Sequence, residues 1–267
     1  MHYLKYTTSS FNSINNNPKH RFAQNHALNI YRHNAIYSYI PKNACSTMRL
    51  SIAMANGAIK DKKDFNWIHN NNGAFSADMR DLVQCKYAFT ILRDPFSRLV
   101  SVFLDKFINR DVVAWKYIAL HNRAINLDDV TFEFFIKSLE NPTIRNGNIH
   151  WKPQEDFLVF EDYDDYFAFE EFQKIRVKLK NKIDLDIVDA RPLVDHHTSG
   201  YKVLEGDSLF KVNPIELLNK KLSGYLPSPE SMFSKEMIEI VNKVYINDIE
   251  LYNSKISNSL ITLKDKL

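Results

Sequence analysis

One lysine and a run of small residues follow directly after an apolar segment near the start of the chain. Residues 35–40 are apolar and aromatic, residues 41–47 read Pro-Lys-Asn-Ala-Cys-Ser-Thr, and a helical pattern begins near Ser46. Small residues let the backbone curl, and the N–H groups at a helix start attract anions, to which Lys42 adds a positive charge. The segment therefore indicates a phosphate-binding loop, although a surface turn with an exposed lysine would read the same way.

An arginine and a serine form a second candidate anion site. Arg93 follows the apolar residues 87–92, and Ser101 lies two turns into the next helix, which Asp94 caps and Pro95 begins. The planar guanidinium of Arg93 and the hydroxyl of Ser101 suit a terminal phosphate dianion. The structural alternative is that Asp94 and Pro95 merely begin a helix there.

The elements that must position these residues alternate between strand and helix. Strands are predicted over 35–40 and 87–92, each followed by a helix, over 46–56 and 94–107, and further helices over 130–140, 170–180 and from 234. Such alternation predicts a parallel sheet that binds ligands beyond the carboxyl ends of its strands. We expect an irregular lead-in over residues 1–33 and a single domain over 34–267.

Both motifs resemble those of sulfotransferases that use 3′-phosphoadenosine 5′-phosphosulfate (PAPS). Residues 41–47 resemble the 5′-phosphosulfate loop, and residues 93–101 are similar to the Arg-x-Pro-x-x-Arg-Leu-x-Ser motif for the 3′-phosphate. The loop's Pro-Lys-x-Ala-Cys-Ser/Thr pattern, together with His-Trp-Lys-Pro-Gln at 150–154, resembles the carbohydrate branch, which includes the chondroitin 4-O-sulfotransferases. With the stretches 163–170 and 244–252, the resemblance covers residues 35–252.

This resemblance implies an α/β fold, P-loop-like and three-layered, with a central parallel sheet flanked by helices. It implies transfer of a sulfuryl group from PAPS to a hydroxyl of a carbohydrate, or of another hydroxyl-bearing acceptor, with no metal required. Lys42 would contact the oxygen that bridges phosphate and sulfate, and Arg93 and Ser101 would hold the 3′-phosphate. The remaining donor contacts would come from Asn43, Ala44, Cys45, Ser46, Thr47, Met48, and from a late basic loop containing Ser199 and Lys202.

Sulfuryl transfer to an alcohol needs a base, and histidine suits that role because its ordinary pKa of about 6.5 lies near neutral pH. His69 precedes Arg93 by 24 residues (93 − 69), and the resemblance places a catalytic histidine in this position, at a strand end. His150 is the alternative base. The pair His196 and His197 lacks a recognisable third ligand, so no metal site is expected.

The charge balance excludes little, but it favours no nucleic acid partner. The chain has 35 basic and 32 acidic residues and a formal net charge of +3. The two cysteines, Cys45 and Cys85, predict no disulfide framework, and the sequence has neither an apolar N-terminal run nor 18 consecutive apolar residues. We therefore expect a cytoplasmic protein with no transmembrane segment.

Two other functions remain open at this point. One is a non-catalytic module that binds the nucleotide, which only the catalytic residues would distinguish. The other is a nucleotide-dependent kinase, which the lysine position and the lack of a convincing magnesium-binding aspartate disfavour. Three tryptophans, Trp67, Trp115 and Trp151, could stack on sugars or pack in the core.

Overall fold

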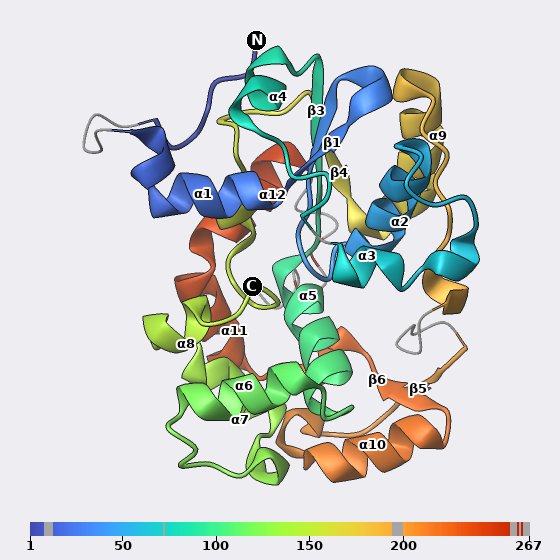
Figure 1. Cartoon of the computed structure of the whole chain (residues 1–267). Helices are drawn as coiled ribbons and strands as arrows, with labels where there is room; N and C mark the ends of the chain where they lie inside the picture. The colour runs from blue at the N-terminus through green and yellow to red at the C-terminus, as the bar shows by residue number, and fades with distance from the viewer. Residues whose placement is uncertain (8–12, 72, 194–199, 257–260, 262, 264–267) are drawn as a thin grey trace. The chain divides into compact units, whose positions relative to one another are not determined.

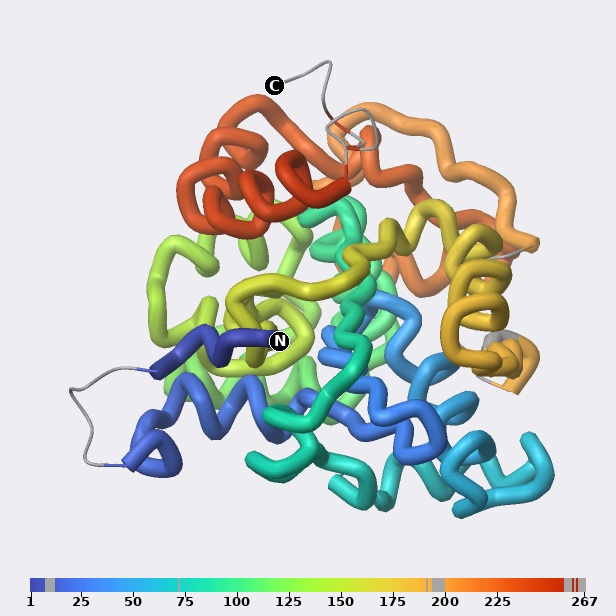
Figure 2. The backbone as a smooth tube through the Cα atoms, turned by 90° about the horizontal axis from the view of Figure 1, so that it is seen from above, coloured from blue at the N-terminus to red at the C-terminus, as the bar shows by residue number. Residues whose placement is uncertain are grey.

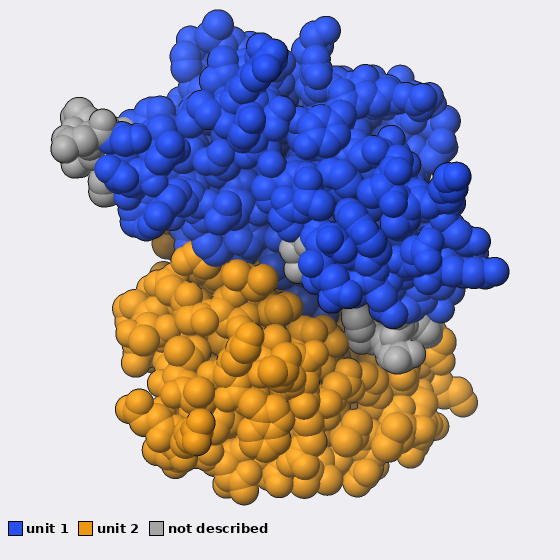
Figure 3. Space-filling model, viewed as in Figure 1, with its two compact units in different colours: residues 1–93, 154–195 blue, residues 94–153, 196–267 orange. Residues whose placement is uncertain are grey.

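The computed structural model describes residues 1–7, 13–71, 73–193, 200–256, 261 and 263 of the 267. The chain forms two compact units, each assembled from two segments, which Figure 3 colours separately. Unit 1 comprises Met1–Arg93 with Gln154–Asp195, and unit 2 comprises Asp94–Pro153 with His196–Leu267. A single domain over 34–267 stays a prediction, because two compact units can still fold together as one domain.

Unit 1 is built on a four-stranded sheet (Figure 1). Its strands and helices are β1 (Ala27–Ile30), β2 (Ala35–Ser38), β3 (Tyr87–Leu92), β4 (Asp165–Ala168), α1 (Pro18–Asn25), α2 (Cys45–Ala55), α3 (Trp67–Asn70), α4 (Met79–Gln84) and α9 (Phe172–Ile183). The strand order is β1-β2-β3-β4, with β1 antiparallel to β2 and the other neighbours parallel. The predicted α/β fold, with a mostly parallel central sheet flanked by helices, is confirmed.

The sheet is held by a core between one of its faces and two helices. Tyr37, Phe89 and Phe167 from three adjacent strands pack with Met48 of α2 and Leu179 of α9 in one cluster of buried side chains. All six residues of β3 are buried, as expected for a parallel strand that is covered on both faces. The continuous apolar run at 87–92 was for this reason a reliable strand signal.

The lead-in over residues 1–33 is not irregular, which corrects the sequence prediction. Asn17 caps α1 and Pro18 begins it, and β1 extends the sheet by pairing with β2. The first residues also pair with the segment that follows Gln154, since Leu4 forms a bridge with Phe160 (Figure 2). A helix of eight residues and a strand of four give too little periodicity to be recognised from sequence.

Unit 2 is mainly helical. Its elements are α5 (Pro95–Val102), α6 (Val112–Leu120), α7 (Phe132–Ser138), α8 (Pro142–Asn146), α10 (Pro214–Leu222), α11 (Lys235–Val244), α12 (Ile246–Lys255) and the short parallel pair β5 (Lys202–Leu204) and β6 (Tyr225–Pro227). The Asp94 carboxylate accepts hydrogen bonds from the N–H groups of Phe96 and Ser97, so the predicted helix start is confirmed. Within the described residues, no helix is both long and apolar enough to cross a membrane.

Candidate functional site

The backbone of the predicted phosphate loop is sharply curled. Lys42 has φ 73° and Ala44 has φ 59°, both in the left-handed region, which costs a residue other than glycine about 1 kcal/mol or more. Ala44 is the N-cap of α2 and provides no side-chain hydrogen bond to the helix. The first N–H groups of α2 therefore lack a side-chain cap, which is the arrangement that favours an anion at a helix start.

The loop is attached to the end of β3 through a buried asparagine and a buried glutamine. Asn43 Nδ2 donates to the Ile91 carbonyl at 2.8 Å and to Gln154 Oε1 at 2.6 Å. Gln154 pairs with the backbone of Arg93, because Oε1 accepts from the Arg93 N–H at 3.1 Å and Nε2 donates to the Arg93 carbonyl at 2.9 Å. Asn43 and Gln154 are 0% and 1% exposed, so water cannot replace these bonds.

The side chain of Arg93 also meets the loop. Its Nη1 donates to the Lys42 carbonyl at 2.9 Å, and its guanidinium lies over the ring of Phe169, 4.3 Å from the centroid. Arg93, the first residue of the second sequence motif, is thus adjacent to the loop in unit 1, because β2 and β3 are neighbouring parallel strands. Sequence reasoning assigned no role to Gln154 or Phe169, although both lie in segments that resemble the carbohydrate branch.

Several loop side chains point into the protein. Met48 is part of the sheet core, and Thr47 Oγ1 accepts a hydrogen bond from the Ala190 N–H at 3.4 Å. Cys45 and Ser46 are half-buried. The buried side chain of Met48 therefore cannot contact a bound nucleotide. The groups that the loop offers to an anion are mainly its backbone N–H groups and Lys42.

His69 lies on the short helix α3, so its expected place at a strand end is wrong. Ile68 of this helix packs with Leu50 of α2, and the exposed His69 ring contacts Phe65 edge-on at 5.0 Å. Tyr39, which directly follows β2, is no alternative base, because burial raises the pKa of its hydroxyl further above neutral pH. The assignment of His69 as base stays a prediction.

The other predicted site residues belong to unit 2. Ser101 is half-buried on α5, and Lys202 is exposed at the first position of β5. The half-buried His150 sits in a turn, where its Nδ1 lies 2.8 Å from Asn148 Oδ1. Ser199 and the His196 and His197 pair lie outside the described residues, and the roles of all these residues stay predictions.

The turn that carries His150 is held by Arg98. This arginine is 1% exposed, and it donates from Nη1 to the Lys152 carbonyl at 2.8 Å and from Nη2 to the Ile149 carbonyl at 3.4 Å. Trp151, fully buried, donates its indole N–H to the Ile144 carbonyl at 2.8 Å. Trp151 is therefore a core residue, whereas Trp115 is 53% exposed on α6.

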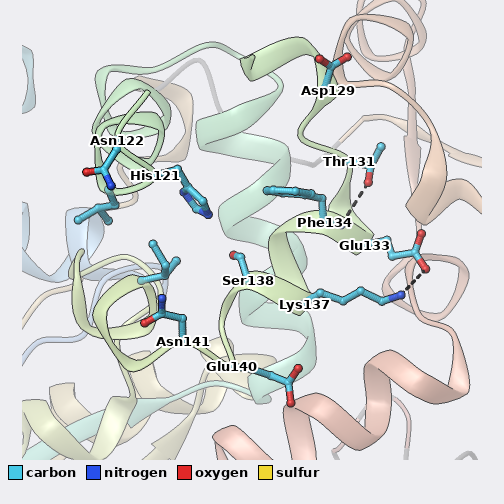
Figure 4. Close-up of a pocket in the computed structure, with 12 residues that line it drawn as sticks. His121, Asn122, Asp129, Thr131, Glu133, Phe134, Lys137, Ser138, Glu140 and Asn141 are labelled. Atoms are coloured by element: carbon cyan, nitrogen blue, oxygen red, sulfur yellow. Dashed lines mark hydrogen bonds and ion pairs between the residues drawn. The ribbon is translucent and has the colours of Figure 1, made fainter. Parts of the chain in front are cut away.

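Unit 2 also contains an open cavity of about 890 Å³ (Figure 4). Its lining includes three carboxylates, from Asp129, Glu133 and Glu140, and a single lysine, Lys137, which pairs with Glu133 at 3.2 Å. A lining with net negative charge repels phosphate groups. The cavity is therefore a poor site for a nucleotide. No group of three or more metal-binding side chains occurs among the residues that the structure describes.

Parts of this chain are similar in sequence to carbohydrate sulfotransferases. Carbohydrate sulfotransferase 14 of Danio rerio is 30% identical over 148 residues, which cover 48% of this chain and 39% of that protein. Carbohydrate sulfotransferase 12 of Xenopus laevis is 31% identical over 99 residues, covering 28% and 24%, and carbohydrate sulfotransferase 10 of Homo sapiens is 25% identical over 165 residues, covering 52% and 46%. The chain spans at most about half the length of these relatives. No solved structure matches it.

The family model described as "Sulfotransferase family" matches residues 25–254. This range contains the loop at Lys42, the strand-end Arg93 and the segment around Gln154, which are the residues that unit 1 brings together. The match extends over most of the chain, and therefore the protein belongs to the sulfotransferase family.

Proposed function

We propose that this protein transfers a sulfuryl group from PAPS to a hydroxyl of a carbohydrate. The observation that carries the proposal is the adjacency of two anion-binding motifs, the uncapped start of α2 behind Lys42 and the guanidinium of Arg93, joined by a hydrogen bond of 2.9 Å. Family membership supports the reaction, and the names of the relatives support the carbohydrate acceptor.

In this proposal the chain positions the donor by its phosphates. Lys42 and the N–H groups that follow Asn43 hold the 5′-phosphosulfate, while Arg93, assisted by Ser101, reads the 3′-phosphate. The remaining contacts are assigned to residues 44–48 and to Ser199 and Lys202, as the family resemblance implies.

The reaction exchanges one S–O bond for another. The bond between sulfur and the bridging phosphate oxygen breaks, the acceptor oxygen bonds to sulfur, and a base takes the hydroxyl proton. Negative charge grows on the leaving phosphate oxygen, where the Lys42 ammonium stabilises it. His69 is the proposed base and His150 the alternative.

Calorimetry with the product nucleotide tests the donor assignment. We expect 3′-phosphoadenosine 5′-phosphate (PAP) to bind at least about 10-fold more tightly than AMP, since only PAP offers a 3′-phosphate to Arg93. Equal affinities for the two nucleotides would refute the proposal. Lys42→Ala should abolish transfer of radiolabelled sulfate to a carbohydrate panel, while Lys86→Ala, at an exposed lysine just before β3, should not.

The same transfer assay tests the base and separates an enzyme from a nucleotide-binding module. His69→Ala should lower kcat by ~10²- to 10⁴-fold and leave the Kd for PAP unchanged. Full activity in His69→Ala with a loss in His150→Ala would move the base to His150. Tight PAP binding with no transfer to any acceptor would favour the non-catalytic module.

A further inference from the structure

We propose that Gln154 is a positioning residue that fixes the donor loop and the strand-end arginine in one arrangement, so that both phosphate ends of the donor depend on a single buried amide. The inference rests on the proposed function. It concerns four residues of unit 1, Lys42, Asn43, Arg93 and Gln154, which come from three separate segments of the chain and are linked by hydrogen bonds.

The backbone of Arg93 determines how the Gln154 amide is oriented. The Arg93 N–H requires an acceptor and its carbonyl requires a donor, at 3.1 Å and 2.9 Å. Only the orientation with Oε1 toward the N–H and Nε2 toward the carbonyl satisfies both groups. Gln154 thus pairs with the end of β3 much as a neighbouring strand would.

This orientation in turn fixes Asn43. Gln154 Oε1 also accepts from Asn43 Nδ2, whose second bond goes to the Ile91 carbonyl, so both Asn43 contacts need the amide nitrogen. Asn43 lies between Lys42 and Ala44, the two residues with left-handed backbone. The buried network therefore holds the middle of the loop at the point where its conformation is least favourable.

A shift in this hydrogen-bond network would displace the groups that bind both ends of the nucleotide donor. Lys42 and the start of α2 face the 5′ end in the proposed function, and Arg93 faces the 3′ end. Misplacing binding groups by about 1 Å can reduce a reaction rate by ~100-fold. Gln154 bonds to the loop through Asn43 and to the strand end through Arg93. Its loss should therefore weaken binding of the 5′-phosphate and also reduce the additional affinity that the 3′-phosphate provides.

Gln154→Met tests this role, because methionine is similar in length and cannot form the hydrogen bonds to Asn43 and to the Arg93 backbone. We expect the Kd for PAP to rise about 10- to 100-fold. We also expect weaker AMP binding and a smaller PAP-to-AMP preference. In the transfer assay the KM for the donor should rise while the KM for the acceptor stays within twofold of the wild-type value.

Tyr87→Phe is the matched control at the opposite end of β3. Tyr87 is 6% exposed, and its hydroxyl donates to Asp165 Oδ2 at 2.7 Å, so the variant loses a buried hydrogen bond far along the strand from Arg93. It should lower the urea midpoint and leave both Kd values unchanged. A Gln154→Met protein that binds PAP within twofold of wild type, or a Tyr87→Phe protein that loses as much affinity, overturns the inference.

Asn43→Ala approaches the same link from the loop and covers the case in which Gln154→Met does not fold. It should raise the Kd for PAP to a similar degree. The Kd of the double variant should be at most about twofold higher than that of the weaker-binding single variant, because both changes remove one shared interaction. Additive losses would contradict the link. A wild-type protein that binds PAP and AMP equally would instead refute the proposed function itself, and the inference with it.

Discussion

Replacing the buried Arg98 by methionine should destabilise unit 2 strongly. Arg98 is 1% exposed, and its guanidinium donates to the carbonyls of Lys152 and Ile149 at 2.8 Å and 3.4 Å, among its other contacts. A hydrogen bond from a charged donor contributes about 1.5–3 kcal/mol, and the longer contact contributes less. Removing the cation also relieves part of its desolvation cost. We expect Arg98→Met to lower the free energy of unfolding by about 2–4 kcal/mol.

Arg145 provides a matched control for this change. It also donates to two backbone carbonyls, those of Leu139 and Glu140, at 2.9 Å and 3.4 Å, but its side chain is only half-buried. Water can replace the lost donor there, so Arg145→Met should cost about 1 kcal/mol or less. The loss in the free energy of unfolding for Arg98→Lys should lie between these two values, because an ammonium group cannot reproduce the planar set of donors of a guanidinium.

Urea unfolding followed by circular dichroism measures these differences through the midpoint at constant slope. The reasoning fails if Arg98→Met is no less stable than Arg145→Met, since both changes remove donors to backbone carbonyls and the buried Arg98 should cost more. It also fails if Arg98→Lys matches the wild type. Either result would show that burial of the guanidinium does not determine the cost.

Three further changes have defined outcomes. Burial raises the pKa of Asp165, but hydrogen bonds from two lysines of α9 outweigh this effect and hold the pKa below its usual 3.8. The wild type should therefore be more stable than Asp165→Asn above about pH 4, and this difference should disappear as the pH falls through the lowered pKa. A difference in the free energy of urea unfolding that is constant down to pH 2.5 would contradict this. Asp94→Ala removes the cap of α5 and should cost about 1–2 kcal/mol in the same assay, whereas an unchanged midpoint would count against the cap. Phe169→Leu removes the ring beneath Arg93 and should raise the Kd for PAP about 2- to 5-fold in calorimetry, with the Kd for AMP unchanged. An equal loss of affinity for AMP would contradict this.

The parts of the fold that were predictable from sequence are those specified by neighbouring residues. The apolar run of β3 ends where predicted, and Asp94 and Pro95 begin α5 as their local hydrogen bonds require. The strand β1 was missed because its four residues become a strand only by pairing with β2. His69 was misplaced for a similar reason, since the short helix α3 depends on packing against α2 and not on its own periodicity.

The candidate site was predictable to the same extent. The predicted parallel sheet placed both motifs at the carboxyl ends of strands, and the neighbouring parallel strands β2 and β3 bring Lys42 and Arg93 side by side. The link through Gln154 was not predictable, because this residue lies 111 residues from Asn43, whose side chain it contacts, and 61 residues from Arg93, whose backbone it contacts. A sequence motif shows that such a glutamine is present, but its partners are defined only by the tertiary structure.

The bonds around Arg93 change how its role in the site is understood. An exposed arginine would lose much side-chain entropy on binding a phosphate, whereas this guanidinium is already oriented by the Phe169 ring and the Lys42 carbonyl. A group held in place before the ligand arrives binds it at a smaller entropic cost. The same contacts tie the arginine to the loop, so Arg93 stabilises the curled backbone in addition to presenting positive charge. The loop at Lys42 and the strand-end Arg93 are therefore better understood as one preorganised candidate site in unit 1 than as two independent ones.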